Sequence, residues 1–206
     1  MGEIDMLFDG PEKGPVFALA HGAGAAMDST WLKNLARDLG AEGIRVVRFE
    51  FPYMHARREG RRPPPDREPV LLSTWRTVIA ELGGAERLVI GGKSMGGRMA
   101  SRVADEMGVR GLVCLGYPFH PPGQPEKTRT AHLADLRTPT LIVQGTRDTL
   151  GSREDVDGYT LSPRIRIVWL EDGDHSFKPR ASSGRTERQN LTAAVAAVAA
   201  FVHSLF

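Results

Sequence analysis

The chain has 206 residues, of which 41% are hydrophobic and 25% are charged, and its formal net charge at pH 7 is +2. This length suits one α/β domain over residues 1–206 and is too short for two sizeable domains. The small net charge gives no strong attraction to nucleic acid or anionic lipid, and no stretch is apolar for the length that spans a membrane, so we expect neither nucleic acid nor membrane as a partner.

The first segments of the chain carry a strand pattern and then a helix pattern. Residues 4–8 suit an antiparallel strand at the edge of a sheet, and residues 16–20 form an apolar run typical of a buried strand. A helical pattern follows at residues 28–39. The first six residues have neither a basic start nor a long apolar run, so we expect no secretory signal.

A loop of small residues follows the strand at 16–20. Residues 21–25 read His-Gly-Ala-Gly-Ala, which lets backbone N–H groups approach a ligand. We expect Gly22 and Gly24 to border the ligand, the N–H of Ala23 to donate to it, and His21 to anchor the loop. A phosphate loop is the alternative, but neither GxxxxGK[ST] nor GxGxxG is present.

An irregular segment, residues 51–69, lies between a strand expected at 44–49 and a helix expected at 70–82. It holds several arginines and three consecutive prolines, so we expect no helix or strand through its middle. One interpretation is a solvated surface loop. The other gives Tyr53, His55 or arginines of the segment contacts with substrate, because ligands of open α/β sheets bind where strands end.

A strand and a tight turn come next. Residues 87–91 read Arg-Leu-Val-Ile-Gly and suit a strand. Residues 92–96 read Gly-Lys-Ser-Met-Gly, and apolar residues then recur at helical spacing. In this context G-x-S-x-G predicts a strained turn that exposes the hydroxyl of Ser94 as a nucleophile. A Cβ at Gly92 or Gly96 would collide with the neighbouring strand and helix. The alternative is a glycine-rich turn with an incidental serine, because the pentapeptide also occurs by chance.

The helix that begins after Ser94 aims backbone N–H groups at the space beside the hydroxyl. An acyl-transfer site needs donors for an oxyanion. We expect the N–H of Met95 and the N–H of Ala23 to form that pair.

The strand expected at residues 112–115 holds Cys114, the only cysteine. No internal disulfide can form, which fits a reducing compartment, so we expect a cytoplasmic protein. Residues 117–123 form a loop after this strand, and we expect Tyr117 and His120 in it to lie near substrate. A short helical piece is expected at residues 132–136.

An aspartate follows the strand expected at residues 140–144. Asp148 lies in a loop where a carboxylate can accept from an imidazole Nδ1–H, fix its tautomer and stabilise the imidazolium. It can also be a turn aspartate that only holds the loop. Asp172 and Asp174 are rivals, but they adjoin the expected histidine in sequence, where side chains seldom point at each other.

A histidine follows the strand expected at residues 165–170. His175 lies in a glycine-containing loop that returns over the sheet edge, which suits a general base. His132 and His203 fall in helical segments and suit surface or packing roles. The last helix is expected at residues 186–203.

Strand and helix patterns alternate throughout the chain, which predicts a mostly parallel sheet with helices on both faces. The three expected catalytic residues occur in the order Ser94, Asp148, His175, each after its own strand. Short stretches carrying them, with the small-residue loop, resemble the alpha/beta hydrolase superfamily. The stretches are residues 21–24, 91–98, 145–148 and 174–177.

The resemblance covers nearly the whole chain. It is greatest to a compact group within the superfamily. That group is similar to dienelactone hydrolases and to the hydrolase-like domain in a subunit of a histone-acetylating complex. It implies a three-layer alpha/beta hydrolase fold, a serine-hydrolase mechanism and no cofactor. No long insertion separates the strands at 112–115 and 140–144, so we expect no cap domain and no lipase-type lid.

The sequence therefore predicts a small hydrolase, monomeric or homodimeric, that cleaves an ester or thioester of a small molecule through an acyl-enzyme on Ser94. No metal is expected, because no His, Cys or Asp cluster has ligand spacing. Two alternatives stay open. One is a binding or scaffold domain that retains the fold but little catalysis, and the other is a peptidase or perhydrolase with the same three residues.

Overall fold

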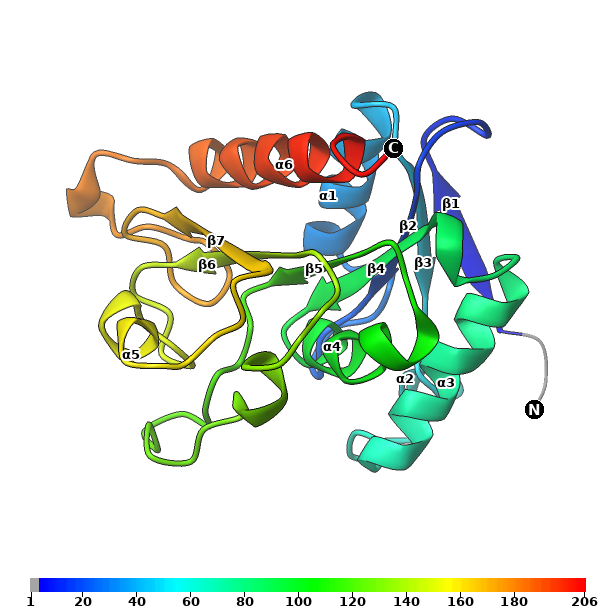
Figure 1. The fold of residues 1–206 in the computed structure, drawn as a ribbon, viewed down its shortest axis with the longest axis horizontal. Coiled ribbons are helices and arrows are strands. Elements are labelled where there is room, and N and C mark those ends of the chain that lie inside the picture. Colours follow the sequence, from blue (N-terminus) through cyan, green and yellow to red (C-terminus); the bar gives the residue numbers. More distant parts are fainter. Residues whose placement is uncertain (1–3) are drawn as a thin grey trace.

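The fold is built on one sheet. Within residues 4–206, which the computed structural model describes, seven strands lie in the order β1-β3-β2-β4-β5-β6-β7 (Figure 1). All neighbouring strands are parallel except β1 and β3, which are antiparallel. The strands are β1 (Met6–Asp9), β2 (Val16–Ala20), β3 (Arg45–Phe49), β4 (Leu88–Lys93), β5 (Gly111–Leu115), β6 (Thr140–Gly145) and β7 (Ile165–Leu170).

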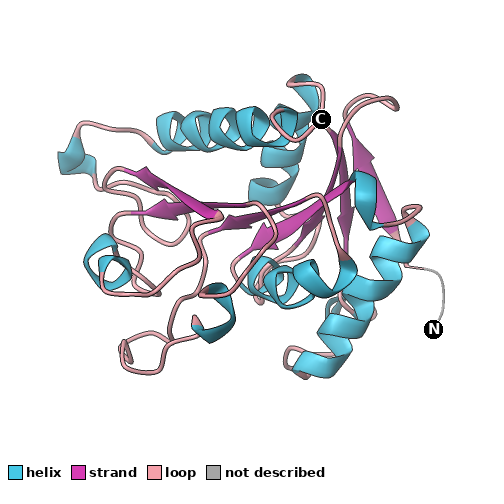
Figure 2. Cartoon of the chain, viewed as in Figure 1, coloured by secondary structure: helices cyan, strands magenta, loops and turns pink. Residues whose placement is uncertain are grey.

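Helices cover both faces of this sheet. Helices α1 and α6 pack side by side on one face, and α2, α3 and α4 lie on the other (Figures 1 and 2). The helices are α1 (Thr30–Ala41), α2 (Pro52–Arg58), α3 (Glu68–Glu81), α4 (Met95–Met107), α5 (Arg153–Asp157) and α6 (Glu187–His203).

Alternate side chains of the strands pack into two apolar cores, one on each face of the sheet. In β2, Phe17 and Leu19 join the core under α1 and α6, whereas Ala18 and Ala20 join the core that contains Trp75 of α3. Because both faces are covered, the central strands are apolar without alternation. This arrangement brings the carboxyl ends of the parallel strands to one edge.

The expected three-layer arrangement is confirmed, including the antiparallel edge strand. Between β5 and β6 the described chain forms loops and one 3₁₀ turn (Ala131–Leu133), so no cap domain intervenes there. The expectation about a secretory signal rests partly on residues 1–3, which lie outside the described residues.

Two short helices were not expected from the sequence. Helix α2 occupies the start of the segment predicted to be irregular, because Pro52 stands in the first turn, where a missing N–H costs nothing. Helix α5 follows a capping box in which Ser152 and Asp155 bond reciprocally with each other's backbone N–H groups. Helix α5 thus depends on its capping box, whereas the N-cap residue of α2, Phe51, makes no side-chain capping bond. Both helices are too short to show a periodic apolar face.

Candidate active site

Ser94 stands on a strained turn between β4 and α4. Its backbone has φ 50° and ψ −116°, in a region that side-chain-bearing residues rarely adopt and that costs about 1–3 kcal/mol. A Cβ at Gly92 would lie 2.5 Å from the carbonyl oxygen of Ala20, and one at Gly96 would lie 2.5 Å from that of His21. The expected need for both glycines is therefore confirmed, since only glycine lets the turn approach β2.

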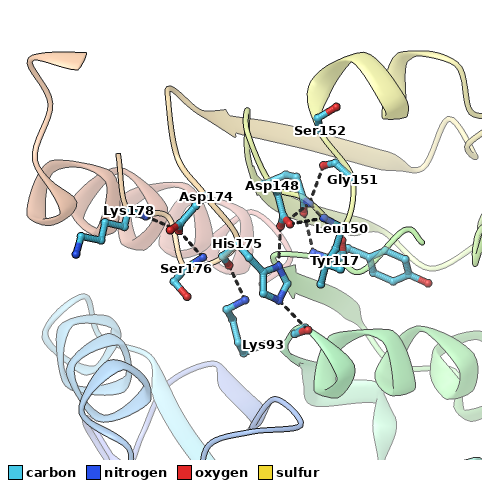
Figure 3. Close-up of polar contacts among 12 residues, drawn as sticks. Lys93, Tyr117, Asp148, Leu150, Gly151, Ser152, Asp174, His175, Ser176 and Lys178 are labelled. Carbon is cyan, nitrogen blue, oxygen red and sulfur yellow. Dashed lines mark hydrogen bonds and ion pairs between the residues drawn. The ribbon is translucent and has the colours of Figure 1, made fainter. Parts of the chain in front are cut away.

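A chain of hydrogen bonds runs from this serine to the loops after β6 and β7. The Oγ of Ser94 lies 2.9 Å from Nε2 of His175, and Nδ1 of His175 lies 2.8 Å from Oδ2 of Asp148. Figure 3 shows the imidazole of His175 directly below the carboxylate of Asp148, with the hydrogen bond between them drawn as a dashed line. The structure thus brings together the three residues that the sequence proposed as nucleophile, base and orienter.

Asp148 is fully buried, and other groups satisfy its carboxylate. Oδ1 accepts from the backbone N–H of Leu150 at 2.9 Å, and Oδ2 accepts from Nε2 of Gln144 at 2.9 Å. Gln144, buried at the end of β6, also bonds to the backbone N–H and carbonyl of Tyr117. Gln144 was not among the residues expected at the site, although a polar residue in a buried strand is a usable signal.

The two rival aspartates have other partners. Asp172 pairs with Arg180 and Arg147, and hydrogen bonds from Arg180 lower the pKa of its carboxyl to about 2. Asp174 accepts from the backbone N–H groups of Ser176 and Lys178, at 2.7 and 2.9 Å. Both therefore shape the loop that presents His175 rather than contacting its imidazole.

The small-residue loop lies against Ser94. A Cβ at Gly22 would be 3.7 Å from that of Ser94. Nε2 of His21 accepts from the backbone N–H of Phe51 at 3.1 Å, and burial lowers the pKa of His21, which keeps this acceptor nitrogen unprotonated. The expected anchoring role of His21 is thus confirmed, while the oxyanion donors Ala23 and Met95 stay a prediction.

A cavity of about 420 Å³ opens beside Ser94. Its walls come from the loop 21–25, from Trp31 of α1, and from Lys93, His175 and Ser176. Gly22 and Gly24 border it, as expected.

The four other residues expected near substrate do not line this cavity. Tyr53 is buried, and its hydroxyl donates to the carbonyl of Ala23 at 3.1 Å, so it supports the loop instead. His55 lies at a separate hollow beside Asp5. Tyr117 and His120 are buried, because the chain turns inward after β5 instead of forming a roof.

The arginines of the segment 51–69 mostly bind the chain itself. Arg58 pairs with Glu50 and Asp28, and Arg57 donates to the carbonyl of Pro63. Among residues 4–206, no three His, Cys, Asp or Glu side chains gather as metal ligands would.

A family model described as an alpha/beta hydrolase domain matches residues 13–203, so the chain belongs to the alpha/beta hydrolase family. An alpha/beta serine hydrolase without lid from Xanthomonas campestris is 24% identical, with a TM-score of 0.69 over 98% of this chain and 88% of that one. The fold is thus the expected alpha/beta hydrolase fold without a cap domain.

Two further solved structures have the same fold. Est1E of Butyrivibrio proteoclasticus, bound to ferulic acid, is 16% identical with a TM-score of 0.72, over 98% of this chain and 95% of that one. The monoacylglycerol lipase of Paleococcus ferrophilus is 16% identical with a TM-score of 0.70, over 97% of this chain and all of that one. At these identities the likeness shows the fold alone.

The helices within residues 4–206 are too short or too polar for any of them to cross a lipid bilayer.

Proposed function

We propose that this protein is a serine hydrolase that cleaves an ester or thioester of a small molecule through an acyl-enzyme on Ser94. The observation that carries the proposal is the continuous hydrogen-bond chain from the Oγ of Ser94 through His175 to the buried Asp148, beside a cavity. Nucleophile, base and orienter are within reach of one another without any rearrangement.

The reaction begins when the Oγ of Ser94 attacks the acyl carbonyl while Nε2 of His175 takes the hydroxyl proton. The N–H groups of Ala23 and Met95 donate to the oxyanion. The imidazolium then returns the proton to the alcohol or thiol as it leaves. Water, deprotonated by His175, attacks the acyl-enzyme, and Ser94 regains its proton as the carboxylic acid departs.

Asp148 acts through the histidine. Its buried carboxylate accepts from Nδ1–H, so Nε2 is left as the basic nitrogen that faces Ser94. The carboxylate also stabilises the imidazolium that forms during attack, and this effect is largest where water is excluded.

The substrate class follows from the family and from the shape of the site. The related structures include a serine hydrolase without lid, a protein that binds ferulic acid and a monoacylglycerol lipase, all consistent with acyl-ester chemistry. No cap domain follows β5, so the cavity beside Ser94 is walled only by the loop 21–25, the start of α1, Lys93 at the end of β4 and the loop that carries His175. We therefore assign a small acyl group to this site.

Replacement of Ser94 tests the proposal. Purified wild-type protein should hydrolyse short p-nitrophenyl esters, and Ser94→Ala should lose about 10⁴-fold or more in kcat. Ser101→Ala is the matched control, because Ser101 is also a serine hydrogen-bonded to a histidine, with Oγ 2.8 Å from Nε2 of His132.

The control should keep kcat within about threefold of wild type, as most changes outside a reacting site do. Folded wild-type protein with no measurable hydrolysis would favour the scaffold alternative. Hydrolysis that survives in Ser94→Ala would place the nucleophile elsewhere.

A further inference from the structure

Lys93 lies directly before Ser94, at the end of β4, and its ammonium reaches across to the loop that carries the base. Nζ donates to the backbone carbonyl of His175 at 2.7 Å (Figure 3). The aromatic rings of Trp31 and Phe177 each lie with their centroids 5.9 Å from Nζ. A Cβ at residue 116 would lie 2.8 Å from Nζ, so Gly116 leaves the room that the ammonium occupies.

The bond from Lys93 differs from the other hydrogen bonds that hold the loop 171–178, which carries His175. Asp174 bonds to backbone N–H groups within the loop, and the N–H of Arg147 bonds to the carbonyl of Gly173. Those bonds fix the loop to itself and to the chain after β6, while Trp31 of α1 and Asn190 of α6 donate to the carbonyls of Ser176 and Phe177. The bond from Lys93 instead joins His175 to the strand that carries Ser94.

We propose that Lys93 is a positioning residue whose ammonium, by holding the carbonyl of His175, keeps the imidazole within hydrogen-bond distance of the Ser94 hydroxyl. The inference rests on the function proposed above. Charge matters because a hydrogen bond from an ammonium is roughly twice as strong as one from a neutral donor. A looser bond lets the base drift, and small displacements of a catalytic group lower kcat strongly.

The surroundings of Lys93 make its charge sensitive to pH. Burial lowers the pKa of Lys93 to about 8, while the carboxylates of Asp148 and Asp174 oppose this shift. Those two groups and His175 are the titratable groups that face it from the loops after β6 and β7. From α1 and the turn after β5 it meets Trp31 and Gly116, which carry no charge.

Catalysis therefore requires that His175 is deprotonated and that Lys93 is protonated. His175 must be neutral to accept the proton of Ser94, which gives a rise of kcat with pH. Lys93 must be charged, so kcat falls as pH rises through about 8. The profile should therefore have an alkaline limb that belongs to Lys93.

The experiment measures kcat and KM for a short p-nitrophenyl ester from about pH 6 to about pH 10 in wild type, Lys93→Met and Lys93→Arg. Lys93→Met should lower kcat about tenfold or more, change KM less than about twofold, and lose the alkaline limb. Lys93→Arg should recover most of kcat without that limb, because a guanidinium stays charged. Lys178→Met, which removes an exposed lysine of the same loop, should retain the wild-type profile.

Melting curves and circular dichroism spectra check that each variant is folded. If Lys93→Met does not fold, the pH profile of kcat for Lys93→Arg alone shows whether the alkaline limb belongs to Lys93. An alkaline limb that persists in the variants, or a KM increase with kcat unchanged, would overturn the positioning role. Wild type that hydrolyses esters through Ser94 would then leave the proposed function standing, whereas inactive wild type removes both proposals.

Discussion

Asp148 and Asp174 are both acidic residues close to His175, yet their environments differ. Asp148 is fully buried and accepts from the imidazole, whereas Asp174 uses its Oδ1 to accept two backbone N–H groups of its own loop. A buried carboxylate that bonds Nδ1–H sets the tautomer of the base. The difference in environment therefore predicts a difference in catalytic effect.

Asp148→Asn should lower kcat about 10⁴-fold, because an amide at this place favours the tautomer that leaves Nε2 protonated. Asp174→Asn should lower kcat less than about tenfold, since the amide oxygen can still accept from the loop. Steady-state kinetics of the two variants at one pH measure both effects. If Asp148→Asn left kcat unchanged while Asp174→Asn lowered it strongly, the assignment of Asp148 as the carboxylate that orients His175 would be wrong.

The sequence indicated which residues come together at the site, but not which side chains face the cavity. Ser94, Asp148 and His175 follow strands whose carboxyl ends share one edge of the sheet, so topology alone brings them close. The orientation of Tyr53 and His120 depends on how α2 and the chain after β5 fold inward. Those directions are decided by tertiary packing, which local sequence patterns do not contain.

The nucleophile turn is the element in which backbone geometry is most restricted. Gly92→Ala would place a methyl carbon 2.5 Å from the carbonyl oxygen of Ala20, whereas no atom lies within 4 Å of a Cβ at Gly24. Gly92→Ala should lower the free energy of unfolding by about 2 kcal/mol or more, as overpacking does. Gly24→Ala should change it by less than about 0.5 kcal/mol. Urea denaturation measures both, and equal stabilities would show that the turn adapts.

The contact between the 3₁₀ turn and α4 predicts a dependence of stability on pH. Burial, with Arg102 and Arg98, lowers the pKa of His132 to about 4 from 6.5. Below about pH 6.5 the unfolded chain therefore binds a proton at His132 that the folded chain does not bind. The stability that comes from keeping His132 neutral is fully present above about pH 6.5, and the free energy of unfolding decreases as pH falls toward 4.

Melting temperatures of wild type should consequently fall more steeply than those of His132→Gln between about pH 7 and about pH 4.5. The glutamine variant keeps a donor and an acceptor for Ser101 but has no proton to gain. Parallel curves for the two proteins would contradict the lowered pKa of the half-buried His132.

Long elements were predictable from the sequence, and short ones were not. The parallel strands β2 and β7 have the expected bounds because each is an apolar run between clear breaks. Helices α2 and α5 have seven and five residues, too few for a periodic pattern to be recognised. Their existence depends on capping and on contacts with the rest of the chain.

For the whole molecule, the absence of a cap domain between β5 and β6 predicts substrate size. Each added methylene contributes about 0.8 kcal/mol only where it is buried, and short loops offer little buried apolar surface. The kcat/KM for p-nitrophenyl esters should therefore peak at about two to four acyl carbons. A preference for long chains, or activation at a lipid interface, would show that these loops close over the substrate.

The overall architecture was the most predictable feature, because regular alternation of strands and helices leaves few topologies once connections are short and right-handed. The match over residues 13–203 places that architecture in the alpha/beta hydrolase family. Family membership does not by itself give activity. The proposed chemistry rests on Ser94.

Mapping of a covalent fluorophosphonate adduct is the most direct test of Ser94 as nucleophile. Wild-type protein should gain one adduct, and peptide mass spectrometry should locate it on Ser94, because its Oγ lies 2.9 Å from Nε2 of His175, the proposed base. Ser101 is the internal comparison, since it contacts His132 but is buried. An adduct on Ser101 or another residue, or a folded protein that takes no label, would contradict the account.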